Sequence, residues 1–159
     1  MPSVLFVCTA NRCRSPIAMT LLREKVKRLA SGEIWLIESA GTWTIEGLPA
    51  VDGAQLVMAE KGLDLSLHFS HQVTGEMLRS FPLILTMERG QKEALQIEFK
   101  EVSSRVFLLS EMVGMINDIS DPVGKSLTEF RQTAVDIETL IDQGFDRIYQ
   151  LAQAGAVSD

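Results

Sequence analysis

The strongest constraint on the fold of this chain is a short apolar run that leads into a loop and then a helix. Residues 4–7, Val-Leu-Phe-Val, contain no polar side chain, which is typical of a strand buried on both faces. Cys8 ends the run, and Pro16 opens a helical pattern that continues to residue 29. The chain therefore begins with a strand, a loop and a helix.

The same alternation continues along the chain. Three further apolar runs predict strands, at residues 34–37, 83–87 and 106–109. Further helical patterns follow them or lie between them, at residues 50–61, 74–79, 88–96 and 127–152. Because the strands are apolar throughout, we predict an α/β fold with a parallel sheet covered on both faces. Ligands of such sheets bind beyond the carboxyl ends of the strands, where Cys8 lies.

Length and charge narrow the function classes. The 159 residues suit one domain, spanning 1–159. The net charge of −6 and the lack of a long basic cluster argue against nucleic-acid binding. No apolar run approaches the roughly 20 residues of a membrane span, and the N-terminus lacks a signal-type core. We therefore expect a cytoplasmic chain without a membrane partner, and a monomer.

Cys8 and Cys13 both lie in the first loop, which bears on their chemistry. A structural disulfide framework would spread its cysteines across the fold. A structural zinc site usually needs four ligands, and only His68 and His71 could join the two thiols. Reduced, reactive thiols are the better interpretation, with no metal or other cofactor, and the two histidines are expected to make structural or surface hydrogen bonds.

The loop between Cys8 and the helix is suited to surround and bind an anion, and we call it the cradle. Its backbone N–H groups, the Arg14 guanidinium and the positive end of the helix dipole would converge on one point. These same groups favour an ionised thiol over a neutral one. The pattern therefore predicts a nucleophilic sulfur at Cys8 that faces a bound phosphate.

Two motifs together resemble a known family. Cys8, five intervening residues and Arg14-Ser15-Pro16, with Asp121-Pro122 late in the chain, are similar to the low-molecular-weight protein tyrosine phosphatases. Ser39-Ala40-Gly41, expected just after the second strand, also fits this family. The resemblance implies a three-layer fold with a four-stranded parallel sheet. It also implies hydrolysis of phosphomonoesters without a metal, on phosphorylated proteins or small phosphate esters.

Each motif residue then has an expected role. Cys8 would attack phosphorus and form a cysteinyl-phosphate. Arg14 would bind two phosphate oxygens with its planar fork. Asp121, stiffened by the following proline, would be the general acid and later the base, with a bell-shaped pH–rate profile and an acidic optimum. Ser15 would donate to the thiolate, and Asn11 would lock the loop. The complete expected phosphate-binding set is Thr9, Ala10, Asn11, Arg12, Cys13, Arg14 and Ser15.

Several assignments stay open at this point. Asp118 is a nearby carboxylate that could be confused with Asp121. Cys13 is either an inert core thiol or a redox partner that forms a reversible disulfide with Cys8. Trp43 is either partly exposed core or a wall of the substrate cleft, and we expect Arg12 and Val123 at the same cleft.

The chain also departs from the family pattern. Ala10 replaces a usual glycine, which requires a negative φ there. Arg12 stands where the family has an aliphatic residue, or threonine in the bacterial protein-arginine phosphatases. Val123 and Gly124 replace the aromatic residues that follow Asp-Pro in tyrosine-specific members. The non-aromatic loop favours a protein-arginine phosphatase, whereas Arg12 argues against one, so protein-arginine phosphatase activity remains an alternative. Two further alternatives are an arsenate reductase, which would need further cysteines, and a non-catalytic module that binds a phosphoprotein or an oxyanion.

Overall fold

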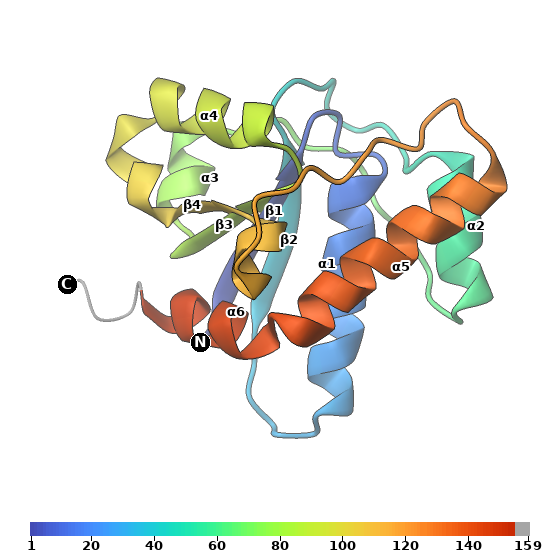
Figure 1. Ribbon diagram of the computed structural model, residues 1–159, viewed down its shortest axis with the longest axis horizontal. Helices are drawn as coiled ribbons and strands as arrows, with labels where there is room; N and C mark the ends of the chain where they lie inside the picture. Colours follow the sequence, from blue (N-terminus) through green and yellow to red (C-terminus); the bar gives the residue numbers. More distant parts are fainter. Residues whose placement is uncertain (155–159) are drawn as a thin grey trace.

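One four-stranded parallel sheet forms the centre of the molecule (Figure 1). The computed structural model describes residues 1–154. The strands are β1 (Ser3–Cys8), β2 (Leu36–Gly41), β3 (Leu83–Thr86) and β4 (Val106–Leu108). They pair in the order β2-β1-β3-β4, and every pair is parallel. This confirms the predicted α/β fold and places β1, which delivers Cys8, in the interior of the sheet.

Helices cover both faces of this sheet (Figure 1). The α-helices are α1 (Arg14–Arg28), α2 (Asp52–Glu60), α3 (Gly75–Arg79), α4 (Arg89–Glu98), α5 (Leu127–Gln143) and α6 (Phe145–Ala154). Two 3₁₀ segments that the sequence patterns did not predict flank β4, namely η1 (Lys100–Arg105) and η2 (Leu109–Val113). Among the described residues, no helix combines the length and the apolar character that crossing a bilayer requires.

Alternate residues of β1 supply two hydrophobic cores. Val4 and Phe6 pack with α1, α5 and α6 on one face, whereas Leu5 and Val7 pack with α3 and α4 on the other. All four side chains are fully buried, as the uninterrupted apolar run predicted. Residues outside the sheet thus hold β1 from both sides, and the loop after Cys8 starts from a rigid base.

The second strand was misplaced by the apolar pattern. Residues 34–37 were predicted, but the strand runs from Leu36 to Gly41, and Ile34 lies outside it with its side chain exposed. The pairing of β2 with β1, from Ser3 with Leu36 to Cys8 with Gly41, sets these bounds. Polar residues are tolerated here because β2 is an edge strand. The Ser-Ala-Gly motif therefore lies within the strand, not after it.

The predicted single terminal helix over residues 127–152 is wrong in one respect. Helix α5 ends at Gln143, and α6 begins at Phe145. Gly144 separates them as the C-cap of α5, and it packs so closely against η2 that a Cβ at this position would lie 2.6 Å from Cβ of Met112. The apolar stripe continues across the break, so periodicity alone did not reveal it.

Candidate active site

The loop of residues 9–13 forms a cradle of backbone donors at the carboxyl end of β1. None of the five N–H groups of this loop donates to a protein acceptor within residues 1–154. Asn11 and Cys13 are buried, and because buried backbone N–H groups are nearly always paired, free donors at these two positions are unusual. Helix α1 begins at the next residue and directs its N-terminus at the same place. The arrangement fits an oxyanion, as the strand-loop-helix pattern predicted.

Cys8 lies at the floor of a small hollow of about 120 Å³ within this cradle. Its Sγ is 3.0 Å from Oγ of Ser15, the hydrogen-bond contact expected for a hydroxyl that supports a thiolate. The hollow also contains several of the predicted site residues, and its lining consists of Cys8, Ala10, Arg12, Cys13, Arg14, Val51, Asp121 and Val123. The structure thus brings together residues from both ends of the chain.

Arg14 is held rigidly beside the hollow. Its side chain is only 4% exposed, and Nη1 donates to Oε1 of Glu88 at 2.6 Å and to the carbonyl oxygen of Ile119 at 2.8 Å. A buried guanidinium requires such partners, because an unpaired buried charge is costly. Sequence reasoning missed Glu88. The sequence signal for Glu88 was its position just after the predicted third strand. Because β3 is parallel to β1, the residues that follow both strands lie at the same edge of the sheet.

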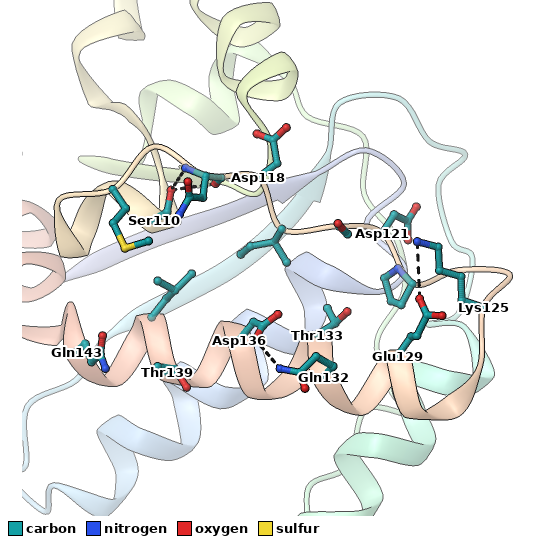
Figure 2. Close-up of a pocket in the computed structure, with 16 residues that line it drawn as sticks. Ser110, Asp118, Asp121, Lys125, Glu129, Gln132, Thr133, Asp136, Thr139 and Gln143 are labelled. Carbon is teal, nitrogen blue, oxygen red and sulfur yellow. Dashed lines mark hydrogen bonds and ion pairs between the residues drawn. The ribbon is translucent and has the colours of Figure 1, made fainter.

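The two candidate carboxylates have different surroundings. Asp121 lines the hollow, and its Oδ2 lies 3.8 Å from Nη2 of Arg14. Asp118 instead accepts hydrogen bonds from the backbone N–H and Nε of Arg89, and these bonds lower its pKa. Figure 2 shows the carboxylate of Asp118 directed away from α5 and from Asp121. Asp118 therefore anchors its segment at α4, and Asp121 is the carboxylate that lines the hollow together with Cys8.

Asn11 fixes the shape of the cradle. It adopts a φ of 57°, the left-handed conformation that asparagine tolerates. Its Nδ2 donates to Oγ of Ser15 and of Ser39, both at 2.9 Å, and its Oδ1 accepts from the backbone N–H of His71 at 2.9 Å. This confirms the predicted locking role. Ser39, which the sequence analysis used only as a family marker, thus helps hold the loop.

Residues at the end of β2 hold the loop through backbone hydrogen bonds. The backbone N–H groups of Thr42 and Trp43 donate to the carbonyl oxygens of Cys8 and Thr9 at 2.9 and 3.0 Å. Gly41 is required at this contact, because a Cβ there would lie 2.5 Å from the carbonyl oxygen of Thr9. The loop is therefore held by β2 as well as by β1 and α1.

Arg12, Trp43 and Val123 occupy different positions relative to the hollow. Arg12 lines it, and Nε donates to the carbonyl oxygen of Pro49 at 2.8 Å. Val123 also lines it and is half exposed. Trp43 is 80% exposed and is not part of the lining, so its place in the substrate cleft stays a prediction. Ala10 has a negative φ, as its side chain requires.

Both cysteines are free thiols in the structure. Cys13 is the residue before α1, and burial, helped by the nearby Cys8 and Asp121, raises its pKa to about 12. Cys13 is therefore a neutral thiol at physiological pH. This supports an inert role in the resting protein and leaves a disulfide with Cys8 as a prediction.

The two histidines make the structural hydrogen bonds that were expected. His68 Nε2 lies 2.8 Å from the carbonyl oxygen of Asn11, so this nitrogen donates, and burial lowers the pKa of the ring. His71 Nδ1 lies 3.1 Å from a carboxylate oxygen of Glu46. Across residues 1–154, no group of three or more His, Cys, Asp or Glu side chains could hold a metal ion.

A larger groove of about 580 Å³ lies beside the hollow, between the segment that carries Asp121 and helix α5 (Figure 2). It shares Asp121 with the hollow but contains neither cysteine. Lys125 and Glu129 form an ion pair of 3.7 Å at one end of it. Cys8, the buried Arg14 and three residues of the cradle all line the smaller hollow, which is therefore the candidate active site.

A thiol in a cradle of backbone donors, with a guanidinium and a carboxylate beside it, defines a phosphate-processing enzyme of the cysteine-nucleophile class. The family model for low molecular weight phosphotyrosine protein phosphatases matches residues 3–154, and the chain belongs to this family.

Named relatives agree with this assignment. The chain is 36% identical over 149 residues to a probable low molecular weight protein-tyrosine-phosphatase, EpsP, of Ralstonia nicotianae, covering 94% of this chain and 97% of the relative. It is 37% identical over 141 residues to a protein-arginine-phosphatase of Geobacillus stearothermophilus, covering 88% and 91%. The crystal structure of a low molecular weight protein tyrosine phosphatase from T. tengcongensis superposes with a TM-score of 0.87 at 35% identity, covering 92% of this chain and 99% of that one.

Proposed function

We propose that this phosphatase hydrolyses phosphotyrosine in proteins through a cysteinyl-phosphate on Cys8. The observation that carries the proposal is the geometry of one hollow. Cys8, Asp121 and the loop residues Ala10, Arg12 and Cys13 all line it, and Arg14 is fixed at its side. Nothing in this set requires a metal ion.

In the first step the Cys8 thiolate attacks phosphorus in line with the ester oxygen. The S–P bond forms as the P–O bond breaks, and Asp121 gives its proton to the leaving oxygen. In the second step Asp121 takes a proton from water, which attacks phosphorus. The S–P bond then breaks and inorganic phosphate leaves. Ser15, 3.0 Å from the sulfur, stabilises the departing thiolate by donating its hydroxyl proton in a hydrogen bond.

The cradle stabilises the charge that develops on the phosphoryl oxygens. The N–H groups are already in place and need no reorganisation during the reaction. Arg14 has one nitrogen engaged by Glu88 and Ile119, which fixes the plane of its guanidinium. The remaining donors of the fork are then available to two phosphoryl oxygens.

The chemistry is tested with p-nitrophenyl phosphate in the presence of EDTA. We expect turnover that EDTA does not change, and its abolition by Cys8→Ser with phosphate binding retained. Asp121→Asn should lower kcat by a factor on the order of 10². The matched control is Asp142→Asn on α5, which removes the same charge at a surface pair with Lys25. Phosphate binding without turnover by the wild-type protein would instead support an oxyanion-binding module.

Protein-arginine phosphatase activity is the second candidate, because one relative at 37% identity has that name. Arg12 favours phosphotyrosine. Its guanidinium lies at the lining of the hollow, where it would stack on a phenyl ring but repel the cationic guanidinium of phosphoarginine.

Matched phosphotyrosine and phosphoarginine peptides test this preference. We expect a higher kcat/KM on the phosphotyrosine peptide than on the phosphoarginine peptide. Arg12→Gln should reduce the ratio of these two kcat/KM values, because it should raise activity on phosphoarginine. Faster turnover of phosphoarginine by the wild-type protein would reverse the assignment.

We also propose that the protein acts as a cytoplasmic monomer and that its thiols are redox-sensitive. The Cys8 thiolate would attack hydrogen peroxide, so that an S–O bond forms, the O–O bond breaks, and a sulfenic acid and hydroxide result. The Cys13 thiol would then form the S–S bond and release water. Sedimentation tests the monomer, and non-reducing mass spectrometry after peroxide treatment tests the disulfide.

A further inference from the structure

Residues at the start of α4 contact three segments that surround the reactive site. Glu88, the residue before this helix, pairs with Arg14. Arg89 binds Asp118, which begins the segment leading to Asp121. The third contact is made by Gln91, whose side chain is 5% exposed and which no sequence motif indicated.

The side-chain amide of Gln91 joins two of these parts directly. Its Oε1 accepts from the backbone N–H groups of Met87 and Glu88, both at 3.0 Å. Its Nε2 donates to Oγ1 of Thr9 at 3.0 Å. One buried amide thus connects the residue after the nucleophile with the backbone of the residue that holds Arg14.

Capping of α4 does not account for both contacts. The capping box uses only the oxygen of Gln91, and glutamate serves equally well at this position in other helices. The bond to Thr9 uses the nitrogen and reaches across to the cradle. A glutamate here would also place a negative charge beside the phosphate site, where it would repel the substrate. The amide therefore meets a requirement of the site and not only of the helix.

We propose that Gln91 is a positioning residue for the reaction, which fixes the cradle relative to the Glu88–Arg14 pair through its hydrogen bond to Thr9. This inference rests on the proposed phosphatase function. The carbonyl oxygen of Thr9 already accepts a hydrogen bond from the N–H of Trp43, and the bond from Gln91 fixes its side chain as well. Loss of the bond lets the loop and the guanidinium shift independently, and phosphate binding weakens with turnover.

A double-mutant cycle between Thr9→Val and Gln91→Leu tests the proposal. The readouts are kcat/KM on p-nitrophenyl phosphate, Ki for inorganic phosphate and Tm. Thr9→Val removes only the acceptor and should lower kcat/KM and phosphate affinity by roughly three- to tenfold with Tm nearly unchanged, the effect of one hydrogen bond. Thr9→Ser keeps the oxygen and should restore both values. Adding Thr9→Val to Gln91→Leu should have no further effect.

The control is Gln96→Leu on the same helix, which removes a hydrogen bond from Nε2 to the carbonyl oxygen of Ser103 at 3.1 Å, away from the site. It should lower Tm and leave kcat/KM and Ki unchanged. The proposal would be overturned if the effects of Thr9→Val and Gln91→Leu on kcat/KM were additive. It would also be overturned if Gln91→Leu lowered only Tm, as expected for Gln96→Leu. If Gln91→Leu does not fold, wild-type values of kcat/KM and Ki in the Thr9→Val protein would be sufficient to overturn the proposal. Wild-type protein without turnover would refute the phosphatase function itself.

Discussion

Cys8 and Cys13 share one loop and both line the hollow, yet the two thiols have different neighbours. Cys8 opens into the hollow beside free N–H groups and the Ser15 hydroxyl. Cys13 is buried at the start of α1, where burial raises its pKa to about 12. The sequence places both cysteines in the same motif, and only the fold identifies Cys13 as a buried thiol that stays neutral.

This difference predicts selective alkylation. At pH 8 iodoacetamide should modify Cys8 rapidly and leave Cys13 unmodified, because Cys13 stays protonated up to about pH 12. Peptide mass spectrometry after a timed quench measures both rates, and unfolding in urea should expose Cys13 to the reagent. Labelling of Cys13 in the folded Cys8→Ser protein at the rate of the unfolded chain would contradict this account.

The same pKa has a consequence for stability. The unfolded thiol ionises near 9 and the folded one near 12, so the folded state holds the proton more tightly in between. This contribution is complete below pH 9 and is lost as the pH rises toward 12. Cys13→Ala should therefore lose less stability than the wild type over that range in urea titrations. Parallel pH curves for the two proteins would be inconsistent with a buried neutral thiol.

At the scale of elements, the edge strand β2 does more than extend the sheet. Its last residue, Gly41, lies so close to the cradle that a Cβ would reach the Thr9 carbonyl oxygen at 2.5 Å. The following two residues donate backbone hydrogen bonds to the loop. The position of β2 therefore determines the shape of the phosphate site.

Gly41→Ala should displace the loop, since the new Cβ would meet backbone atoms of Thr9 and Ala10 and no flexible side chain can move aside instead. We expect a loss of about 1–3 kcal/mol in the free energy of unfolding and a weaker affinity for phosphate. The control is Gly90→Ala in α4, where a Cβ meets no atom within 4 Å and alanine favours the helix. Urea unfolding and phosphate inhibition measure both effects. Wild-type phosphate affinity in Gly41→Ala would show that the contact does not shape the cradle.

The elements also show where sequence reasoning succeeds. The apolar run and Arg14-Ser15-Pro16 correctly predicted β1, the loop and α1, because each depends on local pattern. The bounds of β2 depend on pairing with β1, so they were not predictable locally, whereas Gly144, the C-cap of α5, was a local stop signal that the continuous apolar stripe outweighed. Glu88 and Gln91 were missed for the same reason as the bounds of β2, since their partners lie more than seventy residues away.

For the whole molecule, the central question is whether the two cores act as one unit. They lie on opposite faces of the sheet and share only the strands between them, chiefly β1. Trp35 packs against Phe145 on one side, with 5.7 Å between ring centroids, whereas Trp43 lies next to the phosphate loop. The two tryptophans thus report on different parts of the fold.

Because both cores depend on β1, we predict a single cooperative unfolding transition, which also tests the one-domain assignment over 1–159. Trp35→Phe and Trp43→Phe each leave one tryptophan. In each variant, the urea midpoint from tryptophan fluorescence should coincide with the midpoint from far-ultraviolet circular dichroism of the same variant. Inorganic phosphate should raise all of them together. Separate transitions for the two fluorophores would indicate that the phosphate loop beside Trp43 unfolds independently of the core around Trp35.

The covalent intermediate is the most direct test of the account. In Asp121→Asn, p-nitrophenolate leaves without a proton, but the attacking water has no base, so the intermediate should accumulate. Rapid-quench mass spectrometry should find one phosphoryl group on the peptide that contains Cys8, formed with a stoichiometric burst of nitrophenolate. Cys8→Ala should show neither. Steady turnover with no phosphorylated Cys8, or with the phosphoryl group on another residue, would contradict the mechanism.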